Sequence, residues 1–533
     1  MSLLSVRDLS LRVHQTPILS AVSFDIAPGD TFGLVGESGS GKSMTALAIM
    51  GLLPGGSVVS GTVDFLGQNL VGSSEHHLTR LRGNEIGMIF QEPMTALNPM
   101  QTIGNQVAET LLIHRVATRG DALKVAREKL ARVGLAPDQF PLSRYPHELS
   151  GGQRQRVAIA MAIALRPKLL IADEPTTALD VTTQAQILDL LNSLTTEEDM
   201  ALMLITHDLA VVAGRTTHTA VMQRGRIVEQ GATETLFRQR RHEYTRRLFT
   251  AAAHQPRRRS QMQADPLLTV DNAVREYILP RPSAFAPHPR LRAVDGVSLS
   301  IRKGESLGLV GESGCGKSTL TRAILGLDPL QGGAIHLGGT EVTAGRTMPK
   351  SLRAQMQVVF QDPYGSFNPH HRVSRLVAEP FHLIGTPRDA SDRVADALTE
   401  VGLDPSDMDK HIHEFSGGQR QRIAIARALI IRPDLIVLDE AVSALDVRVR
   451  AQVLDLLARL QESHGMAYLF ISHDLSVVRS VTDRVLVMRA GKIVEEGSTE
   501  TVFTAPHHPY TKALITAAPV IPDDWKEVAH AAR

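Results

Sequence analysis

Two copies of one glycine-rich sequence contain the residue types that bind phosphate. GESGSGKSM occupies residues 36–44 and GESGCGKST occupies residues 311–319. Glycines let backbone amides turn inward around phosphate oxygens, and the start of a following helix favours the same negative charge. Lys42 and Lys317 would reach the β- and γ-phosphates of a nucleotide. The sequence therefore predicts two phosphate-binding loops in one chain.

An acid pair follows each loop at the end of an apolar run. Asp173 and Asp439 end the runs LLIAD and LIVLD, and Glu174 and Glu440 come next. A carboxylate at such a strand end can hold the ligand shell of Mg²⁺, and the second acid can polarise the water that attacks the γ-phosphate. A solvated acid pair is the alternative, and the matched positions in both copies argue against it. The predicted metal-binding side chains are Ser43, Gln91, Asp173, Ser318, Gln361 and Asp439.

Histidines and glutamines also recur at matched positions. His207 and His473 each come 33 residues after the second acid, in THD and SHD. Gln91 and Gln361 each follow an apolar triplet, where they could contact the metal or the lytic water and couple chemistry to movement. A lone histidine after a strand is usually a structural loop residue, but the repetition favours a catalytic role. The predicted catalytic residues are Glu174, His207, Glu440, His473, Gln91 and Gln361.

The sequence SGGQ appears at residues 150–153 and 416–419 and opens an apolar helix each time. Two glycines and a serine at a helix start form another anion pocket, although simple helix capping is the alternative interpretation. The predicted phosphate-binding positions are Gly36, Glu37, Ser38, Gly39, Ser40, Gly41, Lys42, Ser43, Met44, Ser150, Gly151, Gly152, Gln153, Gly311, Glu312, Ser313, Gly314, Cys315, Gly316, Lys317, Ser318, Thr319, Ser416, Gly417, Gly418 and Gln419.

These motifs belong to an internal repeat that must position them. From SGGQ onward the two copies lie a constant 266 residues apart, whereas the glycine-rich loops lie 275 apart. Short apolar runs that end in polar loops alternate with segments of helical periodicity, which predicts an α/β core. A stretch of roughly 50 residues before each SGGQ is predicted to form a helical insert. We expect domains at residues 1–255 and 266–533, joined by a polar, proline-bounded linker at residues 256–265.

Composition limits the possible functions. The chain has 533 residues, 43% hydrophobic and 21% charged, and 57 basic side chains against 56 acidic ones. This balance gives no global attraction to nucleic acid or to an acidic membrane. The single cysteine excludes an internal disulfide and fits a reducing compartment. The first residues do not form a secretory signal, and no run of eighteen apolar residues occurs. Arg257 to Arg259 are interpreted as a solvated linker run, and contact with anionic lipid is the alternative.

The order of loop, glutamine, SGGQ, acid pair and histidine resembles the ATP-binding cassette (ABC) ATPases, over nearly the whole chain twice. This resemblance implies two tandem nucleotide-binding domains, each a P-loop RecA-like α/β core with an antiparallel β subdomain and an inserted α-helical subdomain. It implies ATP and Mg²⁺ as ligands. It also implies that each ATP lies between the phosphate loop of one cassette and the SGGQ of the other, so that no self-dimer is needed. Both sites keep every catalytic residue type.

The strings PMTALNP and PYGSFNP, with the tails HEYTRRLFTAAAHQP (242–256) and HHPYTKALITAAP (507–519), are similar to the oligopeptide, dipeptide and nickel importers. That resemblance implies a fused subunit that hydrolyses ATP and docks on two transmembrane permease subunits at the cytoplasmic membrane face. An extracytoplasmic binding protein would deliver the cargo. Nickel or an antimicrobial peptide remains an alternative cargo. A twin-cassette factor acting on ribosomes is a further alternative, disfavoured by the short linker.

Two positions beside the loops are less specific. In the family an aromatic residue stacks on adenine before the phosphate loop, where Tyr277 and His288 compete in the second half and Val13 and His14 stand in the first. Tyr277 is the expected adenine contact. Cys315 lies within the second phosphate loop. We expect its backbone to bind phosphate and its side chain to point away, the alternative being a thiol whose modification blocks ATP.

Overall fold

The computed structural model describes residues 2–91, 96–177, 179–258, 262–279, 281, 287–362, 365–443 and 445–526. The chain forms two compact units. Unit 1 consists of Met1–Leu179, Thr183–Ala253 and Pro519–Arg533, and unit 2 consists of Asp180–Thr182 and His254–Ala518. Both contain the same α/β core, the fold class that the sequence predicts. None of the helices in these described ranges combines the length and apolarity that a bilayer crossing needs.

Unit 1 contains two sheets. The first is antiparallel, with strand order β2-β1-β4-β5. Its strands are β1 (Leu4–Val13), β2 (Thr16–Ile26), β4 (Ser57–Phe65) and β5 (Gln68–Asn69). The second has the order β10-β9-β3-β8-β7-β6 and is parallel except for the β9–β10 pair. Its strands are β3 (Thr31–Val35), β6 (Ile86–Ile89), β7 (Leu169–Asp173), β8 (Ala201–Thr206), β9 (His218–Gln223) and β10 (Arg226–Ala232).

The parallel strands are apolar throughout because both faces of their sheet are covered. In β7, Leu170 and Ala172 join the core beneath the long helices, whereas Leu169 and Ile171 join the core shared with the antiparallel sheet. Successive side chains on a strand point to opposite faces, so a continuous apolar run fills both cores. This arrangement places Asp173, the last residue of β7, at the carboxyl edge of the sheet.

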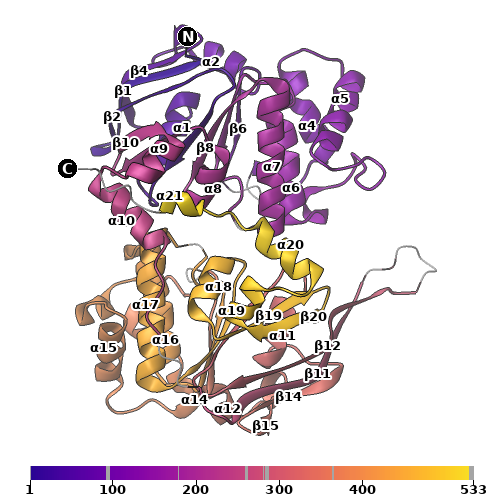
Figure 1. Cartoon of the computed structure of the whole chain (residues 1–533), viewed down its shortest axis with the longest axis vertical. Helices are drawn as coiled ribbons and strands as arrows, with labels where there is room; N and C mark the ends of the chain where they lie inside the picture. The colour runs from indigo at the N-terminus through magenta and orange to yellow at the C-terminus, as the bar shows by residue number, and fades with distance from the viewer. Residues whose placement is uncertain are drawn as a thin grey trace. The chain divides into compact units, whose positions relative to one another are not determined.

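The helices of unit 1 surround this sheet, and α4 and α5 lie together beside α6 (Figure 1). They form the helical insert that the sequence predicts before SGGQ. The helices are α1 (Lys42–Met50), α2 (Glu75–Leu81), α4 (Ile103–Ile113), α5 (Arg119–Arg132), the 3₁₀ turn η1 (Pro146–Glu148), α6 (Gly151–Ala162), α7 (Val181–Glu198), α8 (Leu209–Arg215), α9 (Thr233–Gln239), α10 (Glu243–Ala252) and α21 (Asp523–Lys526).

Unit 2 repeats both sheets, with orders β12-β11-β14-β15 and β16-β17-β18-β13-β19-β20. Its strands are β11 (Pro266–Ile278), β12 (Arg290–Arg302), β13 (Ser306–Val310), β14 (Gly332–Leu337), β15 (Thr340–Glu341), β16 (Met356–Val359), β17 (Leu435–Asp439), β18 (Ala467–Ile471), β19 (Arg484–Arg489) and β20 (Lys492–Ser498). The second sheet is again parallel except for its β19–β20 edge.

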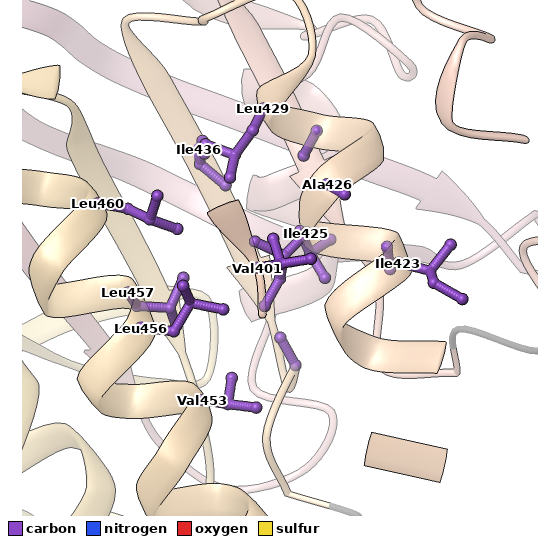
Figure 2. Close-up of a cluster of buried hydrophobic side chains, with 14 of the residues drawn as sticks. Val401, Ile423, Ile425, Ala426, Leu429, Ile436, Val453, Leu456, Leu457 and Leu460 are labelled. Carbon is purple, nitrogen blue, oxygen red and sulfur yellow. The ribbon is translucent and has the colours of Figure 1, made fainter. Parts of the chain in front are cut away.

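The helices of unit 2 follow the same order. They are α11 (Lys317–Ile324), η2 (Gly345–Thr347), α12 (Lys350–Ala354), α13 (Val373–Val377), α14 (Phe381–Ile384), α15 (Ala390–Glu400), η3 (Pro405–Asp409), η4 (Ile412–Glu414), α16 (Gly417–Leu429), α17 (Val447–His464), α18 (Leu475–Val481), α19 (Thr499–Thr504) and α20 (Pro509–Ala517). Figure 2 shows Leu456 and Leu457 of α17, Ile425 of α16 and Ile436 of β17 within one buried cluster. This packing holds α16, and therefore its SGGQ start, against the sheet.

The structure corrects the interpretation of one of the arginines at residues 257–259, whereas Arg257 is exposed as expected. Arg258 forms an ion pair with Asp483, and both side chains are largely buried. Arg258 is therefore not a solvated linker residue, because it anchors the start of the linker on unit 2. Arg259 lies outside the described residues.

Candidate nucleotide-binding and hydrolysis site

The first glycine-rich loop connects the fully buried strand β3 to helix α1. Gly41 caps the helix with φ 104°, and a Cβ there would approach a side-chain carbon of Leu19 to 2.7 Å. Both conditions require glycine. Gly39 also has positive φ, yet nothing lies within 4 Å of the place where its Cβ would be. The tip of the loop is therefore open on one side.

The lysine of each loop is buried and held by backbone carbonyls. Lys42 Nζ donates hydrogen bonds to the carbonyls of Gly36 and Glu37, each at 2.9 Å. Lys317 Nζ donates to Gly311 at 2.7 Å and to Glu312 at 2.8 Å. The two loops therefore hold their lysines in the same way.

The acid pair of unit 1 lies beside this loop. Asp173 is buried, and burial raises its pKa, although a hydrogen bond from Ser43 and the charge of Lys42 oppose this. Its Oδ1 has no hydrogen-bond partner among the described residues. A buried carboxylate oxygen without a donor is costly, and a cation would satisfy it. The oxygen atoms of Ser43 and Asp173 are the ligand type that Mg²⁺ prefers, so these residues fit the metal.

Three side chains orient Glu174. Gln91 Nε2 donates to Glu174 Oε2 at 3.0 Å, and the Thr177 hydroxyl donates to the same oxygen at 2.9 Å. His207 Nδ1 lies 3.2 Å from Oε1. Burial opposes ionisation of Glu174, but the hydrogen bond and charge of His207 outweigh it, and the pKa of Glu174 falls to about 2. The carboxylate is therefore ionised at neutral pH.

Unit 2 contains the same constellation. His473 Nδ1 lies 3.3 Å from Glu440 Oε1. Burial opposes the ionisation of Glu440, and hydrogen bonds from His473 and Gln361 lower its pKa below the usual value. Burial and the neighbouring Glu440 raise the pKa of Asp439. The surroundings of the second acid differ at Ser443, which stands in place of Thr177 and donates to the Glu440 backbone carbonyl at 2.8 Å.

Both second acids adopt an unusual backbone conformation. The φ angle is 46° at Glu174 and 50° at Glu440, in the left-handed region that disfavours side chains with a Cβ. The backbone N–H of Glu174 donates to the carbonyl of Ile205, and that of Glu440 donates to Ile471. This turn directs the carboxylate away from the end of the strand and toward the histidine. Nothing in the local sequence predicts such a conformation for glutamate.

The SGGQ residues lie at the starts of α6 and α16. Ser150 and Gln153 close a capping box on α6: the serine hydroxyl accepts from the Gln153 N–H, and the Gln153 side chain accepts from the Ser150 N–H. Ser416 and Gln419 do the same on α16. Ser150 and Ser416 are exposed. Both serines therefore cap their helices, as the alternative interpretation predicts. Because the serines are exposed, the two helix starts remain accessible to an anion.

Two further predicted residues, Tyr277 and Cys315, are placed as follows. Tyr277 lies on β11, with the guanidinium of Arg275 4.8 Å from the centre of its ring. The Cys315 thiol is buried in the core of unit 2, and burial raises its pKa. The side chain points into the core beneath the loop, where its Sγ lies 3.9 Å from Lys317 Nζ. Residues 92–95 and 363–364, within the strings that follow Gln91 and Gln361, lie outside the described residues.

Sequence reasoning missed two contributions to these sites. Thr177 bonds to the Glu174 carboxylate. Tyr244 and Tyr510, in the two tails, bond to the phosphate loops. Their hydroxyls accept hydrogen bonds from the backbone N–H groups of Glu37 and Glu312. The signal for the tyrosines was present, because they occupy equivalent positions 266 residues apart in the repeated tails.

Comparisons with known proteins identify two family models and several similar proteins. The family model "ABC transporter" matches residues 19–177 and 294–443, and the model "Oligopeptide/dipeptide transporter, C-terminal region" matches residues 494–532. The peptidoglycan transport ATP-binding protein YejF of Agrobacterium fabrum is 48% identical, covering 97% of this chain and 96% of the relative. The glutathione import ATP-binding protein GsiA of Salmonella choleraesuis is 45% identical, covering 97% and 89%. A solved structure of cbiO1 from Clostridium perfringens is 28% identical, covering 45% of this chain and 92% of that one, with a TM-score of 0.40.

Proposed function

The chain belongs to the ABC transporter family, and from this premise we propose that it is the twin-cassette subunit that energises an importer of short peptides or peptide-containing compounds. Its enzymatic activity is ATP hydrolysis. The observation that carries the proposal is that both cassettes retain the complete set of loop lysine, acid pair, histidine and glutamine in one chain that also ends in an oligopeptide-transporter C-terminal region.

In each cassette the chain's own residues would divide the work. Lys42 and the loop amides bind the nucleotide phosphates, and Ser43, Gln91 and Asp173 hold Mg²⁺. The bound ion would neutralise charge between the β- and γ-phosphates. Glu174, ionised and held by His207, accepts a hydrogen bond from the attacking water and orients it. The equivalent residues of unit 2 act in the same way.

Each nucleotide site is proposed to be completed by the other cassette. Ser416 to Gln419 would bind the nucleotide held by Lys42, and Ser150 to Gln153 would bind the one held by Lys317. The exposed serines at the starts of α6 and α16 support this pairing, and so do Gly151 and Gly417, beside which no atom lies closer than 3.8 Å to the place where a Cβ would be. One chain then supplies both halves of both sites.

A groove in unit 2 supports docking on a permease. It has a volume of about 690 Å³ and lies next to the catalytic glutamine. Its lining includes Phe360, Gln361, Glu379, Leu383 and Arg427. Phe360 is exposed although it is a large aromatic residue. A groove lined by both apolar and charged side chains suits a helix from a transmembrane subunit. Movement of that helix would displace Gln361, which lines the groove and bonds to Glu440. We place the protein at the cytoplasmic membrane face.

The cargo follows from the relatives alone, since the cassettes do not contact it. The two relatives are named for the transport of peptidoglycan and glutathione, compounds that contain short peptides. An extracytoplasmic binding protein would select the cargo. Nickel or an antimicrobial peptide is the alternative cargo.

The test is reconstitution. The chain is purified with the permease subunits encoded beside it and placed in lipid vesicles with the neighbouring binding protein. We expect ATP hydrolysis to rise when the binding protein is loaded with a short peptide, and we expect no rise with nickel. Copurification with ribosomes in place of hydrophobic subunits would contradict the proposal.

A further inference from the structure

In each unit, a short helix that follows the last strand of the parallel sheet carries a buried tyrosine. The helices are α10 and α20, and the tyrosines are Tyr244 and Tyr510. Their exposed fractions are 4% and 6%. The tails that contain them were assigned above only as a family marker, and neither the hydrolysis mechanism nor permease docking uses them.

The tyrosine hydroxyls contact the phosphate loops. Tyr244 Oη accepts a hydrogen bond from the backbone N–H of Glu37 at 3.3 Å, across 207 residues of chain. Tyr510 Oη accepts from the N–H of Glu312 at 2.9 Å, across 198 residues. Lys42 bonds to the same loop residue, because its Nζ donates to the Glu37 carbonyl. A single loop residue therefore connects the tail tyrosine to the phosphate-binding lysine.

The rest of the tail holds the tyrosine in place, and it does so identically in both units. Glu229 of β10 accepts from the backbone N–H groups of Arg241 and His242, at 2.8 and 3.1 Å. His242 Nδ1 then accepts from the N–H of Tyr244 at 3.1 Å, which caps α10. In unit 2 the same three bonds involve Glu495, His507, His508 and Tyr510.

We propose that Tyr244 and Tyr510 are positioning residues for nucleotide binding: each fixes the first peptide group of its phosphate loop, which in turn fixes the lysine that receives the nucleotide. The N–H groups of Glu37 and Glu312 are partly buried, and a backbone N–H that is shielded from water must find an acceptor. The tyrosine hydroxyl supplies one from outside the loop, so the loop keeps its binding conformation before the nucleotide arrives. This inference rests on the assignment of residues 36–43 and 311–318 as phosphate loops.

The relationship must be reciprocal. If the tail stabilises the binding conformation of the loop, a bound nucleotide must stabilise the docked tail by the same free energy. Nucleotide should therefore slow amide hydrogen exchange in α10 and α20, although these helices lie outside the nucleotide site. A tail with a purely structural role would exchange at the same rate with and without nucleotide.

The variants Y244F and Y510F, alone and together, test the proposal in the full chain. Phenylalanine keeps the buried ring and removes the hydroxyl that receives the loop N–H. Loss of one such hydrogen bond should raise the dissociation constant of a fluorescent ATP analogue ~3- to 10-fold in the affected cassette. The KM for ATP should rise by the same factor, while kcat at saturating ATP stays near the wild-type value. The reason is that the tyrosine contact is equally present in the ATP-bound ground state and in the transition state.

Y468F is the matched control. Tyr468 is 1% exposed, and its hydroxyl donates to the Leu457 carbonyl at 3.0 Å in the core of unit 2, away from the loop. This variant should lower the melting temperature without changing nucleotide affinity. The proposal is overturned if the double tyrosine variant binds the analogue as tightly as the wild type, or if Y468F weakens binding equally.

Exchange measurements on the wild type provide a test that needs no variant. Protection of α10 and α20 by the ATP analogue supports the proposal, and unchanged exchange there contradicts it. The assignment of the loops is checked separately with K42A and K317A. If both lysine variants bind nucleotide normally, the site assignment has failed, which is distinguishable from failure of the tail contact alone.

Discussion

His207 Nδ1 lies 3.2 Å from Glu174 Oε1, and the equivalent pair, His473 and Glu440, is separated by 3.3 Å. Each histidine sits 33 residues after its acid, at the end of the neighbouring parallel strand. The carboxyl ends of adjacent strands meet at one edge of a sheet, so strand order brings the pair together. The contact holds the carboxylate in its charged form beside the phosphate loop.

The double variant E174Q/E440Q should lose ATP hydrolysis ~100-fold or more while still binding ATP. Glutamine keeps the shape of the side chain but cannot accept a proton from water or carry the charge. Steady-state phosphate release and binding of a fluorescent ATP analogue measure the two properties separately. The matched control is E234Q/E500Q, which changes two exposed acids at equivalent positions of α9 and α19. Hydrolysis at the wild-type rate in E174Q/E440Q would show that another group orients the water.

The contribution of Glu174 to stability should depend on pH. Its pKa is about 2 in the folded protein against 4.5 ordinarily, so the folded state favours the charged form. The stabilisation is fully present above about pH 4.5 and is lost as pH falls toward 2. It should amount to ~1–3 kcal/mol, since a shift of one unit corresponds to about 1.4 kcal/mol. Urea unfolding of the wild type and E174Q at pH 7 and pH 3.5 measures it. A stability difference that grows on acidification would contradict this sign.

The substitution S416R should weaken the nucleotide bound by Lys42 more than the one bound by Lys317. Arginine at this exposed helix start would place a bulky side chain where the opposite nucleotide is proposed to lie. The measurement is nucleotide crosslinking at each loop, read out by mass spectrometry of the labelled peptide. S150R is the mirror-image control and should show the reverse pattern. A defect of S416R confined to the Lys317 nucleotide would show that each cassette completes its own site.

Cys315 should react slowly with iodoacetamide in the folded chain. Its thiol is 7% exposed, and burial raises its pKa, so little thiolate is available. Because it is the single cysteine, the mass change of the intact protein reports on it alone. Labelling should become fast in urea. Rapid labelling of the native protein that also blocks ATP binding would restore the alternative of a reactive thiol at the loop.

The repeated sequence was sufficient to predict much of the architecture. The alternating apolar runs predict buried parallel strands, and β7 and β17 end at the predicted aspartates. The apolar periodicity before SGGQ predicts the helical insert. These features succeed because hydrophobic periodicity and glycine patterns are local properties of a sequence. SGGQ was also predicted to start a helix, and α6 and α16 begin there.

Other features depend on contacts between distant residues and could not be obtained in this way. The bond from Glu37 to Tyr244 joins positions 207 residues apart, and neither residue type is unusual for its segment. The burial of Arg258 depends on its pairing with Asp483, and a run of arginines alone indicates solvent exposure. The repeated tails mark Tyr244 and Tyr510 as a matched pair, but they do not show which residues these tyrosines contact, because side-chain partners are determined by tertiary packing.

The left-handed backbone at Glu174 and Glu440 is a local cost that the contacts of the carboxylate help to offset. A glutamate in this conformation costs about 1–2 kcal/mol that glycine would not. Glycine at position 174 would relax the turn, but it would also remove the bonds that Gln91, Thr177 and His207 make to the carboxylate. The gain and the loss are of similar size, so the contacts that aim the carboxylate at the attacking water also keep the turn in place. Heat resistance and catalysis therefore depend on the same few side chains at this position.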